Sequence, residues 1–567
     1  MNTDMQTIES KTSKQKVKTG GIFFAVFMVL GMLLTACGAG GGTTGSNSHS
    51  NILTIQTGPN GDFTKVFTPF SPTASPGTAG MIYETLLYQN QIKSTTTPWL
   101  ATSYTFSNNN KTLTFTTRQN VKWSDGKPFS ANDVAFTFND IKKYPDADLN
   151  GIWNYVSSVS ATNDTTVVFQ LKQPYTPILN YIGGATYIIP QHIWQSVGDP
   201  AKYANANPVG TGPYKLDNFT PQLYDLTKNT NYWQPGLPKV NELRYPSYNN
   251  NSSLELDMDK GVIDWTSLYT PHLQQGYVQR DPAHNKYWFA PGNDVTLFMN
   301  LTKAPFNNVN VRKAISLVID RSQISKTGET GFELPASPTG LILPNNQQFV
   351  APQYQNLSTQ PNVAQAQQLL SSAGLKKGSD GVMTDASGKK LSFNLNVVTG
   401  WSDWVTDCQI IASELKAIGI QVNVNALSYN AYSVANENGT FDMAIGSVAG
   451  STPFYVYQAL LSKGKSAPVG QIASSNYERW MDPTTEQLLS QYATTTDKNV
   501  QLQALYGLEK IMVEKVPAIP MVYGAFWFEY STKNFTGWPT QDNPYAVGAN
   551  WQAPDNEQTV LHLVPAK

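Results

Sequence analysis

Short stretches in which apolar and polar residues alternate predict β-strands along most of the chain. In residues 113–118 Leu113 and Phe115 alternate with threonines, as expected for a strand with one buried face. Residues 52–55 alternate in the same way. Further strands are expected at residues 166–171, 214–216 and 224–228.

Apolar residues three or four positions apart predict helices between these strands. Ser130 followed by Asp133 has the pattern of a capping box, which predicts a helix through about Lys143. A second helix is expected where Val311, Ala314, Ile315, Val318 and Ile319 fall on one face, with Asn310 as its N-terminal cap. Helices are also expected over residues 364–373, ending at Gly374, and over Met81–Leu87.

One segment carries both signals in succession. Residues 391–398 favour a strand, residues 404–418 a helix and residues 420–425 a second strand, which together predict a β-α-β unit. Strands and helices alternate elsewhere too, without a repeat of fixed period. The chain is therefore expected to be of the α/β class, with a body of two lobes.

The beginning of the chain has the pattern of an export signal. Lysines between residues 11 and 18 precede an apolar run at residues 21–34, which is too short to cross a hydrocarbon core of ~30 Å comfortably. Residues 34–37 resemble a bacterial lipobox, which implies cleavage before Cys37 and a lipid on its sulfur. An ordinary secretory signal that happens to contain a cysteine is the alternative. We expect a lipoprotein signal peptide at residues 1–36, then the lipidated Cys37 and a flexible tether to residue 50.

Composition narrows the range of partners. The 567 residues include only 14% charged residues, and 39 Lys and Arg against 40 Asp and Glu give a net charge of −1. Without excess positive charge, nucleic acid is not an expected partner. The 13 Trp and 28 Tyr exceed what core packing usually requires and indicate a binding cleft, although aromatic residues lie in cores more often than in sites.

Sequence signatures of catalysis are missing. The chain has no His-Glu-x-x-His or Gly-x-Ser-x-Gly motif, and its five histidines lack metal-ligand spacing. No metal, cofactor or catalytic residue is therefore expected, and the protein is not expected to be an enzyme. Apart from Cys37 the only cysteine is Cys408, which we interpret as a buried structural residue of a helix.

A series of short motifs follows in order from Pro98 onwards. The longest are residues 121–129, leading to Ala131-Asn132-Asp133-Val134, and residues 207–214. The others are Lys228-Asn229, Tyr232-Trp233, residues 261–264, Pro305-Phe306, residues 311–315, residues 319–321, residues 364–374 and residues 514–520. In this order they resemble family 5 of the bacterial extracellular solute-binding proteins, the peptide-type receptors of ABC importers.

This resemblance implies a periplasmic-binding-protein-like fold of two lobes joined by a hinge. The first lobe would comprise residues 51–97, 206–298 and 526–567, with an extra subdomain at residues 98–205, and the second lobe residues 299–525. A monomeric receptor is implied, lipid-anchored to the cell membrane in a periplasm or at the cell surface. It would deliver its ligand to ABC permease subunits.

The resemblance also directs attention to the ligand. In this family an Asp in the loop after a strand of the second lobe pairs with the free amine of a peptide, but the matching loop here has no acid between Ile445 and Glu478. Aromatic residues are prominent instead, and residues 400–404, 537–539 and 543–545 resemble the branch of the family that takes oligosaccharides. Sugar rings stack on aromatic faces and bond carboxylates through their hydroxyls. The candidate ligand-binding residues are Trp401, Asp403, Trp404, Tyr455, Tyr457 and Trp527.

Each candidate has an alternative interpretation. The aromatic side chains would otherwise pack between the lobes, and Asp403 would otherwise cap its helix. The function that we expect is capture of a short peptide or an oligosaccharide in the interlobe cleft for an ABC importer. The alternatives are an extracellular hydrolase on a similar scaffold and a structural surface lipoprotein.

Overall fold

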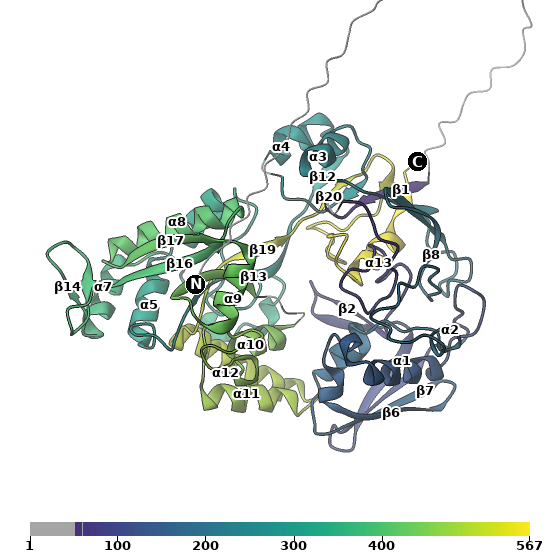
Figure 1. The fold of residues 1–567 in the computed structure, drawn as a ribbon, viewed down its shortest axis with the longest axis horizontal. Helices are drawn as coiled ribbons and strands as arrows, with labels where there is room; N and C mark the ends of the chain where they lie inside the picture. Colours follow the sequence, from purple (N-terminus) through teal and green to yellow (C-terminus); the bar gives the residue numbers. More distant parts are fainter. Residues whose placement is uncertain (1–50, 59–60, 271, 449, 451, 567) are drawn as a thin grey trace, which may run out of the picture. The chain divides into compact units, whose positions relative to one another are not determined.

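The computed structural model describes residues 51–58, 61–270, 272–448, 450 and 452–566, which contain three large β-sheets with helices packed beside them (Figure 1). These residues belong to the compact unit His49–Lys567. The predicted signal peptide, Cys37 and the tether lie outside the described residues. Within the described ranges, no helix combines the length and apolar character needed to cross a membrane.

The first large sheet has seven strands drawn from distant parts of the chain. Its central strand β1 (Ile52–Gln56) runs parallel to both of its neighbours, and the remaining pairs are antiparallel. In spatial order the strands are β12 (Asn285–Tyr287), β20 (Glu529–Ser531), β11 (Trp265–Thr266), β1, β10 (Glu242–Pro246), β9 (Leu223–Lys228) and β8 (Tyr214–Thr220). The strands expected at residues 52–55, 214–216 and 224–228 are confirmed.

The second sheet has five strands and contains the predicted β-α-β unit. Strand β16 (Ser392–Val398), helix α8 (Ser402–Ala417) and strand β17 (Gln421–Leu427) follow one another, with β16 parallel to β17 and α8 packed against both strands (Figure 1). In spatial order the strands are β17, β16, β18 (Met443–Val448), β13 (Ala290–Met299) and β19 (Ile519–Phe526).

The third sheet is antiparallel and lies entirely within residues 98–205. In spatial order its strands are β4 (Ala101–Ser107), β5 (Thr112–Thr117), β7 (Thr166–Leu171) and β6 (Val156–Asn163). Helix α1 (Ala131–Lys143) packs on β6 and β7 and begins with the predicted capping box of Ser130 and Asp133.

The chain passes between the seven-stranded and five-stranded sheets through two short connections. The first, residues 288–289, joins β12 to β13, and the second, residues 527–528, joins β19 to β20. The expected end of the first lobe at residue 298 would assign most of β13 to that lobe. Strand β13 pairs with β18 and β19, so it is part of the five-stranded sheet.

The prediction of a helix over Met81–Leu87 is wrong. This segment is irregular and completely buried, and it leads into β2 (Leu87–Asn90). The carbonyl groups of Met81 and Ile82 accept hydrogen bonds from the backbone N–H groups of Tyr214 and Gly212. Its apolar residues therefore reflect burial on all sides rather than one face of a helix.

The helix on the predicted apolar face is confirmed as α5 (Val309–Val318), but its cap differs. Asn308 is the capping residue, and its side chain accepts the N–H of Asn310. Helix α7 (Val363–Ser372) is also confirmed, and Gly374 follows it with a φ of +83°. The other α-helices of the described residues are α2 (Gln191–Trp194), α3 (Asn251–Asp259), α4 (Leu273–Gly276), α6 (Arg321–Gln323), α9 (Tyr429–Asn438), α10 (Pro453–Leu461), α11 (Pro483–Ala493), α12 (Lys498–Lys515) and α13 (Asp555–His562).

The described residues also form small two-stranded ribbons. They pair β2 with β3 (Thr95–Pro98), β14 (Lys376–Lys377) with β15 (Met383–Thr384), and β21 (Phe535–Thr536) with β22 (Val564–Pro565).

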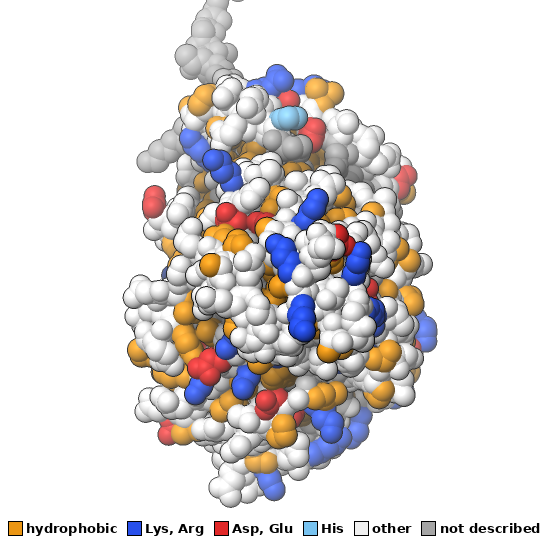
Figure 2. Space-filling model, turned by 90° about the vertical axis from the view of Figure 1, so that its left-hand side faces the viewer, with side chains coloured by type: hydrophobic (Ala, Val, Ile, Leu, Met, Phe, Trp, Pro, Cys, Tyr) orange, Lys and Arg blue, Asp and Glu red, His pale blue; other side chains and the backbone are white. Residues whose placement is uncertain are grey.

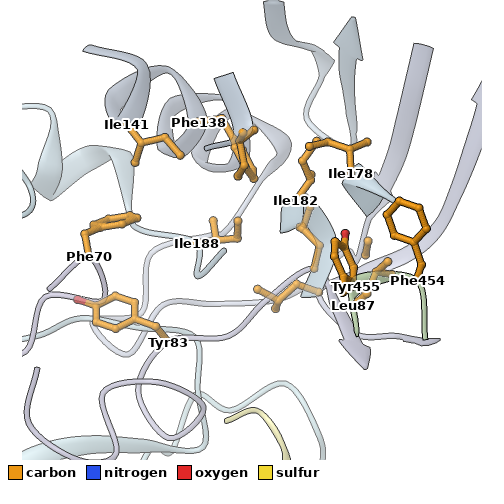
Figure 3. Packing of buried hydrophobic residues seen from close by; sticks show 14 of the residues in the cluster. Phe70, Tyr83, Leu87, Phe138, Ile141, Ile178, Ile182, Ile188, Phe454 and Tyr455 are labelled. Carbon is orange, nitrogen blue, oxygen red and sulfur yellow. The ribbon is translucent and has the colours of Figure 1, made fainter. Parts of the chain in front are cut away.

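Apolar residues from distant segments pack together in the core, and charged side chains are sparse on the surface, in keeping with the low charged content of the sequence. Figure 3 shows Phe454 and Tyr455 of α10 packed beside Leu87 and Ile178, which lie far away in the sequence. Cys408 is buried, as expected for a structural residue, and it forms no disulfide within the part of the chain that the structure describes. On the face in Figure 2 charged side chains occur singly or in small groups among neutral surface.

Candidate functional site

A cavity of about 380 Å³ lies where the five-stranded sheet meets residues near β11 and β20, and we call it the aromatic cavity. Its lining residues are Tyr269, Asn293, Val295, Glu333, Gly400, Trp401, Ser402, Asp403, Trp404, Ser447, Gly524, Ala525 and Trp527. Four of the six predicted ligand-binding residues thus come together here, although Trp401 and Trp527 are far apart in the sequence.

Two aromatic pairs form its walls. The rings of Trp401 and Trp404 are almost perpendicular, with centroids 4.9 Å apart and planes at 88°. The rings of Tyr269 and Trp527 have centroids 5.2 Å apart at 69°. Trp401 is 38% exposed, and the other three rings are half-buried. Their remaining surface is available to a ligand.

The turn between β16 and α8 positions the first pair. Gly400 has a φ of +93°, which a residue with a side chain rarely adopts, and Trp401 is the N-terminal capping residue of α8. Asp403 lies in the first turn, and its Oδ1 accepts the N–H of Trp404 at 2.8 Å. Asp403 thus contributes negative charge to the helix start and the cavity wall, but it is not the capping residue.

A buried carboxyl group, Glu333, faces the same cavity from another segment. Its side chain is 5% exposed, and it accepts the backbone N–H of Ala525 at 2.9 Å. Its second oxygen, Oε2, has no hydrogen-bond partner among the described residues. Burial raises the pKa of Glu333, and the nearby charges of Glu329 and Asp403 raise it further.

Two more carboxyl groups lie behind this wall. Glu329 and Asp407 are both buried, and their two carboxyl groups interact with each other. Burial raises the pKa of both groups, and the charge of Glu329 raises that of Asp407 further. Ionising both carboxyl groups at once is therefore unfavourable, and they keep their protons to higher pH than ordinary carboxyl groups do.

The aromatic wall extends into a smaller neighbouring cavity. This space of about 160 Å³ also contacts Trp401, Trp404 and Ser447, and its other side is lined by Tyr429, Tyr432 and Tyr477 among others. Tyr429 is 61% exposed, and its ring centroid lies 6.1 Å from that of Trp401. A ligand longer than one ring would have further aromatic surface in this direction.

The remaining two predicted residues lie elsewhere. Tyr455 borders a separate cavity of about 500 Å³, but its ring contacts Tyr181 and its hydroxyl donates to the carbonyl of Pro177 at 2.6 Å. Tyr457 is fully buried, with its hydroxyl donating to the carbonyl of Thr339 at 3.0 Å. Both side chains are held by contacts within the protein.

Two lining residues had no sequence signal. Glu333 is a single acid between Phe332 and Leu334, and Tyr269 lies in an irregular stretch after β11. Only the three-dimensional arrangement brings them to the tryptophans. Among the described residues no group of three or more His, Cys, Asp or Glu is arranged to hold a metal ion. The site offers aromatic faces and hydrogen-bond acceptors.

The aromatic cavity is open, has aromatic walls and a few polar groups, and lies next to the two connections between the large sheets. Such a cavity is typical of a protein that binds a small solute. Residues 95–467 match the family described as "Bacterial extracellular solute-binding proteins, family 5 Middle". The chain belongs to this family. Its proteins bind solutes outside the cytoplasm and are not enzymes.

Curated relatives and solved structures agree with the family. The chain is 28% identical over 288 residues to the glutathione-binding protein GsiB of Shigella flexneri serotype 5b (strain 8401), which covers 49% of this chain and 53% of the relative. The chain thus spans about half the length of the curated relatives it matches.

Similarity in structure extends further. The periplasmic oligopeptide-binding protein of an oligopeptide ABC transporter from Thermotoga maritima has a TM-score of 0.82 and 25% identity, covering 91% of this chain and 99% of that protein. Its mannohexaose-bound structure has a TM-score of 0.74 at the same identity and coverage. AppA from Bacillus subtilis, in complex with a nonapeptide, has the same fold, with a TM-score of 0.67, 20% identity and coverage of 91% and 99%. The expected α/β fold is confirmed.

Proposed function

We propose that the protein is the extracytoplasmic receptor of an ABC importer and captures a peptide or an oligosaccharide in the aromatic cavity. The observation that carries this proposal is the convergence of Trp401, Trp404 and Trp527 on one open space of about 380 Å³. Aromatic faces bind the C–H groups of sugar rings and the side chains of peptides, and a few polar groups fix their orientation.

The two ligand classes have separate support. The similar Thermotoga protein is described as oligopeptide-binding and also has a mannohexaose-bound structure. The relative from Shigella is described as binding glutathione, a tripeptide. The aromatic surface running from Trp527 past Trp401 to Tyr429 favours an elongated ligand of either class.

Ligand capture would proceed by closure of two lobes, built on the seven-stranded and five-stranded sheets. Residues 98–205 would form the extra subdomain of the first lobe, and the connections at residues 288–289 and 527–528 would act as the hinge. A ligand that contacts both lobes only when they are closed shifts the population towards the closed form. The closed form would then be presented to the permease subunits.

The expected lipid anchor fits this role. A diacylglycerol on Cys37 would hold the receptor at the membrane, because each buried methylene contributes ~0.8 kcal/mol. The tether to residue 50 would leave the binding body free to approach the permease.

Thermal unfolding of the mature protein tests the proposal. Ligand at about 100 times its dissociation constant stabilises the folded state by ~2.7 kcal/mol, which raises the midpoint by several degrees. Short peptides and α- and β-linked oligosaccharides should be compared on the wild type, Trp401→Ala and Trp404→Ala. A shift that both variants lose supports the proposed site, whereas Trp551→Ala, an exposed tryptophan outside the cavity, should retain it. Absence of a shift with every ligand would contradict the receptor role.

A further inference from the structure

The aromatic cavity is lined in part by buried hydrogen-bond acceptors that have no partner among the described residues. Glu333 Oε2 and Asn293 Oδ1 are both buried and lack a hydrogen-bond partner among the described residues, and both residues line the cavity. Asp403 adds a third carboxylate or amide acceptor to the lining. Such a set fits a ligand group that brings several donors and no acceptor.

The acidic residues also lack positive partners. None of Glu329, Glu333, Asp403 and Asp407 forms an ion pair with Lys, Arg or His within the described ranges. A buried carboxyl group with no opposite charge must either keep its proton or receive a cation from outside. The raised pKa values of Glu329, Glu333 and Asp407 agree with the first state in the free protein.

The surrounding rings suit a cation as well. Within the described part of the chain, five aromatic rings have a Lys or Arg side chain over them: Trp153, Trp233, Trp480, Tyr144 and Phe219. None of these five rings lines the aromatic cavity. The faces of Tyr269, Trp401, Trp404 and Trp527 therefore have no intramolecular cation. An ammonium group bound among them would gain cation–π attraction in addition to its hydrogen bonds.

We infer that the aromatic cavity selects solutes that carry a free ammonium group, with Glu333 as its buried counter-charge and Asp403 and Asn293 as further acceptors. This inference rests on the proposed receptor function and narrows its ligand class. Glu333 lies in the segment between α6 and α7, and Asp403 at the start of α8, so neither belongs to the acid-free loop after β18. Two kinds of ligand carry a free ammonium group: a peptide, through its amino terminus, and an oligosaccharide that contains an amino sugar.

Paired probes separate these sources. Trialanine is compared with N-acetyl-trialanine, and the glucosamine hexamer with its fully N-acetylated counterpart, by isothermal titration calorimetry on the mature protein. Mannohexaose serves as the neutral oligosaccharide. We expect the amine form of one pair to bind at least tenfold more tightly than its acetylated form, and the pair that binds identifies the source.

The variant Glu333→Gln tests the counter-charge. Its amide oxygen can still accept the N–H of Ala525, but it carries no negative charge. We expect this variant to bind the amine and acetylated forms equally well, because the preference depends on the interaction between the ammonium group and the charge of Glu333. The matched control is Glu509→Gln, because Glu509 is also buried and accepts a backbone N–H, from Ala351, but lies outside the cavity. Its preference should remain that of the wild type.

The outcomes distinguish the inference from the function on which it rests. Equal affinity for the amine and acetylated forms, binding of mannohexaose alone, or an unchanged preference in Glu333→Gln overturns the inference and leaves the receptor role intact. Absence of binding by all five probes overturns the inference too, whereas the receptor role is then judged by the wider ligand set of the thermal test. Should Glu333→Gln not fold, Asp403→Asn, a change at a half-buried position, should weaken the same preference, and an unchanged preference there overturns the inference.

Discussion

The indole ring of Trp527 lies edge-on to the phenyl ring of Phe289, with ring centroids 4.7 Å apart and planes at 72°. Phe289 belongs to the first connection between the two large sheets and Trp527 to the second. The same indole also contacts Tyr269 and lines the aromatic cavity. A ligand against Trp527 would therefore touch the place where the chain passes between the sheets, which is the hinge of the proposed closure.

Replacing Trp527 tests this double role. We expect Trp527→Ala to lower ligand affinity about tenfold to hundredfold, because it removes an aromatic wall and the contact between the two connections. Titration calorimetry measures the affinity, and small-angle scattering with saturating ligand measures closure. Trp551→Ala is the control, because Trp551 is 52% exposed and lies outside the cavity. Equal affinity in the two variants would contradict the assignment.

Gly210 is expected to be intolerant of any side chain. A Cβ atom at this position would lie 1.8 Å from the carbonyl oxygen of Ile82, far inside van der Waals contact. We expect Gly210→Ala to lower the free energy of unfolding by about 2 kcal/mol or more, because two buried backbone segments must separate. Urea denaturation measures the change. Gly198→Ala is the control, since a Cβ there meets nothing within 4 Å, and its stability should be unchanged.

The pH dependence of stability should report Glu478. This side chain is fully buried with both carboxyl oxygens unpaired among the described residues, and burial raises its pKa from 4.5 to about 8. The folded protein then holds a proton that the unfolded chain releases at lower pH. Its contribution to stability is complete below about pH 4.5 and is lost as the pH rises towards 8, with a slope of at most ~1.4 kcal/mol per pH unit.

The variant Glu478→Gln isolates this contribution. Its side chain is neutral at every pH, so its unfolding free energy relative to the wild type should increase steadily between pH 5 and pH 8. Urea denaturation at four pH values in this range measures the difference. The exposed Glu514→Gln should keep the pH dependence of the wild type. A difference between Glu478→Gln and the wild type that stays constant with pH would exclude the buried-proton explanation.

The proposed anchor predicts a simple change of location. Cys37→Ser should remove the site of lipid attachment, so that the protein leaves the membrane fraction and no longer incorporates labelled fatty acid. Cys408→Ala should remain in the membrane fraction, because Cys408 is buried within α8. Continued membrane association of Cys37→Ser would favour the alternative of an ordinary secretory signal with another means of attachment.

Local patterns predicted much of the fold because they reflect contacts close in sequence. The capping box of Ser130 and Asp133 and the parallel β16-α8-β17 unit follow the prediction. The segment Met81–Leu87 does not, because its apolar residues are buried by distant strands rather than by a helix of their own. Asn308 instead of Asn310 caps α5, a shift that apolar spacing alone cannot resolve.

The candidate site was predictable where it follows a local cluster. Trp401 and Trp404 lie three residues apart at the start of α8, so the sequence itself shows them together, whereas Trp527 joins them only through the packing of distant segments. Glu333 and Tyr269 were missed because each is a single residue whose place depends on the packing of separate segments. Tyr457 belongs to the same aromatic stretch as Tyr455, but its hydroxyl donates to the backbone carbonyl of Thr339 and takes no part in the cavity.

Strand β20 has a consequence for the order in which the molecule can assemble. It lies between β11 and β12, although it follows both of them by more than 230 residues of chain. Residues 290–526 emerge as one uninterrupted stretch and can pair their own five strands as soon as they are synthesised. The seven-stranded sheet must wait, with β12 lacking its neighbour, until the last part of the chain arrives. A chain that stops after β19 would therefore have a finished second sheet and an open edge in the first, which is the form most exposed to proteases and to aggregation.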